Sequence, residues 1–311
     1  MSSVYLLELR RQLTALGVTG SLRGRIVDEI ADHLECDPDA DLGDPALLAR
    51  QFADELGSAR ARTAALAAFA ALVVAGLVFS AAVLLAPNGV LRAVQSAGPV
   101  VRRTGPPGWA MIPAALEVFL TQIALAAGVL AALRWFWRRG SVILPAAEAG
   151  VLVRRAVVGV VAGIGCMICL ALVAVAGRAQ FGSGWTAFTI GAAGLGLVAL
   201  LASLPSLVSA IRLRPVADGD AGDVIDDLGP LAPDALRGRP WRFALLVAAT
   251  IAVLLTVVSV PADDAFDGAA RGIFDGLACL VGFGLLGPFL GLWSPRRLDG
   301  GDDAPGRSIA G

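Results

Sequence analysis

Charged side chains are scarce in this 311-residue chain. They make up 16% of the residues, whereas soluble globular proteins contain about 25%. Hydrophobic residues make up 57%, and the mean hydropathy is +0.74. This composition excludes an ordinary soluble domain and predicts a polytopic membrane protein.

Histidine is nearly absent too, since His33 is the only one. A catalytic Ser-His-Asp set needs a histidine beside its nucleophile, and a single histidine near the N-terminus offers no such arrangement. The chain also lacks a Walker-type phosphate loop. Cys166 and Cys169 form a C-x-x-C inside an apolar run, without a second cysteine pair, which argues against zinc or redox chemistry. We therefore expect free thiols, no metal, no cofactor and no enzymatic activity.

The first 62 residues contain no long apolar run, so we expect no cleavable signal peptide. From Thr63 onward, apolar runs alternate with short segments that carry arginine. About 20 apolar residues in a helix cross a bilayer core, and six runs qualify: 63–85, 110–133, 156–176, 185–211, 243–260 and 273–293. The sequence thus predicts an all-α protein, with an N-terminal cytoplasmic three-helix module at 1–62, a six-helix transmembrane bundle at 63–293 and a disordered cytoplasmic tail at 294–311.

Arginine is unevenly distributed, and lysine is absent, so arginine supplies all 25 basic side chains. Twenty of them lie in 1–62, 134–155, 212–242 and 294–311, and five lie in the alternate connections. By the positive-inside rule, this split places both termini in the cytoplasm of a multi-pass protein of the cell (plasma) membrane. No internal repeat is visible, so the sequence does not indicate an inverted-repeat transporter.

The N-terminal unit is expected to contain three amphipathic helices, over 4–16, 21–34 and 44–56. Apolar side chains recur every three or four residues in each, which favours one shared core: Leu6, Leu9, Leu13 and Leu16, then Leu22, Ile26, Ile30 and Leu34, then Leu48, Phe52 and Leu56. Eleven carboxylates against seven arginines make residues 1–62 net negative, which opposes direct binding of nucleic acid.

Three stretches of this unit, YLLELRRQL, DEIADHL and LGDPALLARQF, resemble the HAAS family of short helical signalling modules over about residues 3–57. The resemblance implies a cytoplasmic module that binds a protein partner, with PadR-type transcriptional regulators as the associated class. Some members precede permease-like membrane regions. The match is closest at DEIADHL, so our hypothesis places partner binding at Asp28, Glu29, Asp32 and His33.

Two acidic residues, Glu117 and Asp275, lie inside expected spans, where an ionisable side chain is costly and is a functional hypothesis by default. Glu117 could be a proton or cation site, or a neutral acid hydrogen-bonded to Thr121 or Thr186. Asp275 could be interfacial. The function we expect is signalling through the N-terminal module; the alternative is a permease-like transporter or transporter subunit that uses these carboxylates. A dry, packed bundle interior would favour the first.

The segment 216–240 is the one long acidic connection on the expected cytoplasmic side. We expect a solvated loop with one short helix there, and a second docking surface is the alternative.

Overall fold

A computed structural model describes residues 2–37, 40–84, 108–141, 143–213, 216, 224, 227, 240–259, 265–287 and 290. The described residues form helices and no strand, so the all-α prediction is confirmed. The helices are α1 (Ser2–Ala15), α2 (Gly20–Cys36), α3 (Pro45–Leu84), the short η2 (Gly108–Ala110), α5 (Met111–Trp137), α6 (Ala146–Ala176), α7 (Arg178–Arg212), α9 (Pro240–Ser259) and α10 (Ala265–Leu286). The expected tail at 294–311 lies outside the described residues.

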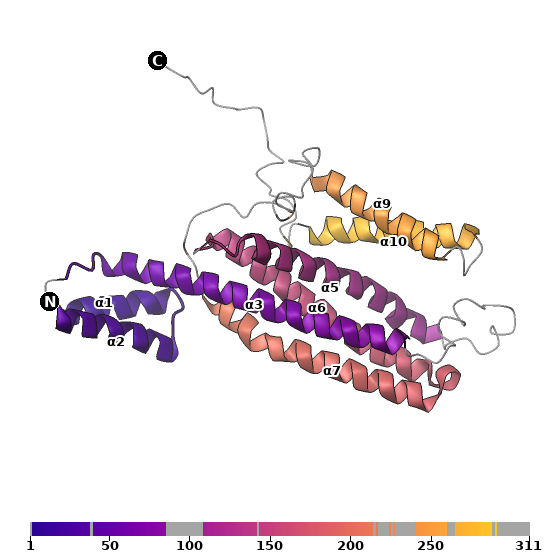
Figure 1. The fold of residues 1–311 in the computed structure, drawn as a ribbon, viewed down its shortest axis with the longest axis horizontal. Helices are drawn as coiled ribbons and strands as arrows, with labels where there is room; N and C mark the ends of the chain where they lie inside the picture. The colour runs from indigo at the N-terminus through magenta and orange to yellow at the C-terminus, as the bar shows by residue number, and fades with distance from the viewer. Residues whose placement is uncertain are drawn as a thin grey trace, which may run out of the picture.

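The apolar stripes of the N-terminal helices meet as the periodicity predicts. Leu9 and Leu13 of α1 are fully buried against Ile26 of α2 and against Ala49 and Ala53 of α3. Asp44 caps the start of α3, because its carboxylate accepts a hydrogen bond of 2.9 Å from the Ala46 amide. These helices therefore pack around one small core at one end of the molecule (Figure 1).

The third N-terminal helix does not end near Leu56, as we expected, but continues to Leu84 as a single 40-residue helix. No glycine in a left-handed conformation and no proline interrupts it. Residues 57–62, GSARAR, are compatible with helix despite their polarity, because alanine and arginine have high helix propensity. The N-terminal helices are thus joined to the first apolar helix by rigid backbone rather than by a linker.

Helices α3, α5, α6 and α7 run side by side along the long axis of the molecule (Figure 1). Their shared core is built from small side chains, with Gly159 and Gly163 of α6 facing Leu72 of α3. A Cβ on Gly159 would lie 2.9 Å from a Leu72 methyl carbon, so this G-x-x-x-G allows close helix packing.

Helices α9 and α10 form a hairpin beside α5 (Figure 1). Gly272 and Gly276 make the close approach possible, since a Cβ on Gly272 would lie 2.4 Å from the Ala252 carbonyl oxygen and one on Gly276 would lie 2.9 Å from that of Ala248. Small residues one turn apart are typical of helix pairs in membranes.

Within the part of the chain that the structure describes, four helices are long and apolar enough to cross a membrane, within 45–82, 112–137, 146–176 and 182–212. Large apolar side chains stay exposed on their outer faces, among them Leu77, Val161 and Val198. Exposing such apolar faces to water is unfavourable, whereas contact with lipid hydrocarbon carries no such cost. The chain is a membrane protein.

Candidate functional site: a buried arginine–aspartate cluster

The helix bundle has one end next to α1 and α2, which we call the proximal end. There α5 finishes and α6 begins, and each helix contributes an arginine that is almost completely buried. Arg134 of α5 is 4% exposed and Arg155 of α6 is 0% exposed. Burying a guanidinium is costly unless charge and hydrogen bonds compensate it. The environment of these two side chains must therefore supply an anion.

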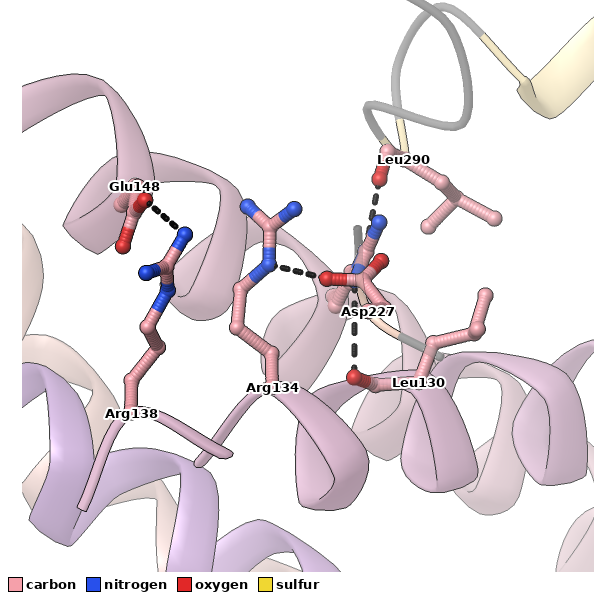
Figure 2. A network of polar contacts seen from close by, with 7 residues as sticks. Leu130, Arg134, Arg138, Glu148, Asp227 and Leu290 are labelled. Atoms are coloured by element: carbon pink, nitrogen blue, oxygen red, sulfur yellow. Dashed lines mark hydrogen bonds and ion pairs between the residues drawn. The ribbon is translucent and has the colours of Figure 1, made fainter. Parts of the chain in front are cut away.

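Asp227 supplies that anion. Its side chain is 2% exposed and lies between the two arginines (Figure 2). The Arg134 Nε donates to Asp227 Oδ1, and the Arg155 Nη1 lies 2.6 Å from Asp227 Oδ2. Burial raises the pKa of the Asp227 carboxyl, whereas the two guanidiniums favour its charged form. We call Arg134, Arg155 and Asp227 the arginine–aspartate cluster.

Arg155 also binds backbone carbonyls from two other segments. Its Nε donates to the Leu290 oxygen at 2.7 Å, and its Nη1 donates to the Leu130 oxygen at 3.4 Å (Figure 2). One side chain on α6 therefore joins α5, the segment that carries Asp227 and the chain that follows α10. The Nη1 of Arg134 is buried and has no acceptor among the described residues.

An apolar layer accompanies the cluster. Val224, three positions before Asp227, is fully buried and belongs to one apolar cluster with Ala127 and Leu290. The expectation of a solvated loop at 216–240 is therefore wrong for Val224 and Asp227. The physical reason is that Asp227 neutralises two arginines that the helices have already buried.

The turn between α5 and α6 is tied to α3 as well. Arg138 forms an ion pair of 2.9 Å with Glu148, which is itself buried (Figure 2). The Leu144 amide donates to Ser58 Oγ at 2.7 Å, and Arg62 Nη2 donates to the carbonyl oxygens of Arg138 and Ser141. The polar segment of α3 thus fastens the turn next to the cluster.

A second junction joins the end of α7 to the N-terminal helices. Leu213 is buried in the core formed by α1, α2 and α3, and the Val216 amide donates to the Asp54 carboxylate of α3 at 2.5 Å. Gly17 has φ +84° and lies against Arg212, so that a Cβ there would be 2.4 Å from the Arg212 carbonyl oxygen. The N-terminal helices therefore share their core with the bundle.

The residues expected to bind a partner lie on α2. Asp28, Glu29, Asp32 and His33 are all exposed, whereas Ile26 of the same helix is buried. None of them belongs to the arginine–aspartate cluster.

Glu117 lies within α5 and is half-buried, and the described residues show no hydrogen bond from it to Thr121 or Thr186. Thr121 instead lies 3.1 Å from the Cys166 sulfur, and Thr186 donates to Gly182 and Ala174 carbonyl oxygens. Asp275 belongs to α10, but its side chain is outside those described. Glu117 therefore does not enter the proximal site.

Sequence reasoning assigned Arg155 and Asp227 to exposed connections and so missed the cluster. One signal was available for Arg155: the residues just before it, AGVLV, are apolar and extend the helix upstream, which places the arginine inside it. For Asp227 the only local signal is Val224 one turn earlier.

The four cysteines are free, and no group of three or more His, Cys, Asp and Glu side chains within the described part of the chain could hold a metal ion. Comparison of the chain with family models, curated proteins and solved structures finds no match.

Proposed function

We propose that this protein is a membrane-anchored signalling or regulatory protein whose N-terminal helices bind a cytoplasmic protein partner. The observation that carries the proposal is the double attachment of these helices to the bundle, by the unbroken α3 and by Leu213 in their core. A rearrangement of the bundle would move α3 or the end of α7 and so change the N-terminal unit. An adaptor attached by a flexible linker would not respond in this way.

The resemblance to HAAS modules supports a protein partner of the PadR-like regulator class. The acidic, exposed face of α2 supports the same reading, because it repels nucleic acid and is open to a basic protein surface. The interior between α3, α6 and α7 is packed with apolar side chains such as Val160, Leu170 and Leu200. This packing favours signalling over the alternative of a permease-like transporter that uses Glu117 and Asp275.

Reversing charge on α2 should abolish partner capture. We expect full-length protein with Asp28→Arg and Glu29→Arg to lose the PadR-like regulator that wild type retains from cytoplasmic extract, by at least tenfold in quantitative mass spectrometry. Both residues are exposed, so stability should change by less than about 0.5 kcal/mol. The full chain is needed as bait, because Leu213 completes the core of the N-terminal helices.

A control variant, Glu8→Arg with Glu55→Arg, makes the same change in net charge on α1 and α3. It should retain the partner. Equal capture by wild type and by the α2 variant would refute this binding face. If both variants lost the partner equally, the loss would follow from the change in net charge and not from the position of the substituted residues.

The proposal includes six spans with both termini cytoplasmic, α9 and α10 being the fifth and sixth. The positions of Arg62, Arg138 and Arg155 at one end of the bundle support this orientation, because the positive-inside rule assigns such an end to the cytoplasm. The glycine-mediated packing of α9 on α10 supports a membrane hairpin.

Reporter fusions test this topology directly. Alkaline phosphatase, which is active only outside the cytoplasm, should be active when fused after Ser96 and inactive when fused after Gly140 or Arg297. A fluorescent protein that folds only in the cytoplasm should give the opposite pattern. An active phosphatase fused after Arg297 would refute the six-span arrangement.

A further inference from the structure

A lateral groove runs between α3 and α5. Its upper part is a cavity of about 380 Å³ at the proximal end, and its lower part is a cavity of about 320 Å³ deeper in the bundle. Phe69 and Val129 line both, so the two cavities are adjacent. Each has the size of an ordinary ligand site. The floor is formed by α6 at Gly163 and Cys166.

The walls of the groove are apolar and follow one face of each helix. On α5 they extend from Thr121 to Phe136, which is about 22 Å of helix. Half of a bilayer's hydrocarbon core measures roughly 15 Å. A chain that enters at the proximal end can therefore lie in the groove over the full depth of one leaflet.

The same two helix faces lead to arginine at the proximal end. Arg139 follows Phe136 by one turn, and its guanidinium carbon lies 4.4 Å from the centre of the Phe136 ring. Arg139 is exposed and makes no hydrogen bond or ion pair within the described residues. Arg62 stands one turn before Ala65 on α3, but its Nη2 donates to the Arg138 and Ser141 carbonyl oxygens and its Nε is buried, so it is not open to a ligand.

We propose that the groove binds one acyl chain of an anionic phospholipid, whose phosphate contacts Arg139. Apolar walls alone would accept any lipid tail, but the exposed Arg139 at the entrance selects for negative headgroup charge. Trp135, which lines the upper cavity, places this entrance at the depth of the headgroups. Assignment to the cytoplasmic leaflet rests on the proposed topology, whereas the headgroup preference does not.

Native mass spectrometry of the full-length protein in detergent tests the proposal. With equal amounts of phosphatidylglycerol and phosphatidylcholine, wild type should retain mainly phosphatidylglycerol. One arginine beside an anionic headgroup contributes about fivefold to binding, so Arg139→Gln should lower phosphatidylglycerol binding by about that factor and leave phosphatidylcholine unchanged. Arg154→Gln, a change at an exposed arginine of α6, is the matched control and should have no effect.

A groove-filling variant tests the acyl-chain part. Gly76 lines the lower cavity, and a Cβ there meets no atom within 4 Å, so Gly76→Phe can fill the groove without a backbone clash. It should reduce binding of both lipids, whereas Gly191→Phe on α7, which is equally open, should not. Soluble glycerol phosphate should not displace the lipid.

Three results would overturn the proposal. They are equal retention of the two lipids by wild type, unchanged phosphatidylglycerol preference in Arg139→Gln, and unchanged lipid binding in Gly76→Phe. None of these readouts depends on the protein partner, so failure here would leave the proposed signalling function standing, and loss of partner capture would leave the lipid site standing.

Discussion

Replacing Arg155 by alanine is expected to lower the free energy of unfolding by about 3–5 kcal/mol. The substitution removes one of the two cations that neutralise buried Asp227, and it removes the donor bound by the Leu290 carbonyl. Chemical unfolding of the purified protein in detergent, followed by circular dichroism, measures the change. Arg154→Ala is the control, because Arg154 is the exposed neighbour of Arg155 and should change stability by less than about 0.5 kcal/mol.

A triple variant separates an uncompensated charge from a simple loss of packing. Arg134→Met, Arg155→Met and Asp227→Leu together remove every charge of the arginine–aspartate cluster. Apolar replacement of a buried ionic triad is often neutral or stabilising, so the triple variant should be more stable than Asp227→Ala alone. If it were less stable than wild type, the cluster would be a net source of stability rather than a costly means of positioning Asp227.

Replacing Gly17 by alanine is expected to destabilise the protein by about 2.5–5 kcal/mol. A left-handed conformation costs a non-glycine residue about 1–2 kcal/mol. The new Cβ would also meet the Arg212 carbonyl oxygen at 2.4 Å, so the end of α7 must move and Leu213 must leave its buried position. Loss of a buried leucine adds about 1.5–3 kcal/mol. Hydrogen exchange should show faster exchange in α1 and α2 together.

Gly20 provides the matched comparison for Gly17. Its φ is +69°, but a Cβ there meets nothing within 4 Å. Gly20→Ala should therefore introduce the backbone strain but no steric clash, and it should lower the free energy of unfolding by only about 1–2 kcal/mol. The difference between the two variants measures the contact between the N-terminal helices and α7. Equal effects would mean that this contact contributes nothing, and the proposed coupling would lose its support at that junction.

Features that depend on near neighbours were predictable. The stripe of leucines in α1 and the Asp44 cap of α3 follow from spacing within one turn, and both are present. The apolar runs that became α3, α5, α6 and α7 were recognised from composition alone. The predicted end of the third helix near Leu56 was wrong, because the polar residues that follow it, GSARAR, also favour helix.

The sequence by itself determined that this chain is helical, enters a membrane and begins with amphipathic helices, because hydrophobicity and periodicity are local properties. Only the tertiary structure decided that Asp227 pairs with Arg134, 93 positions away, and that Leu213 completes the N-terminal core. Such contacts depend on which helices pack together and at what distance. A buried arginine requires an anion, but its own neighbours in sequence do not indicate which carboxylate will supply it.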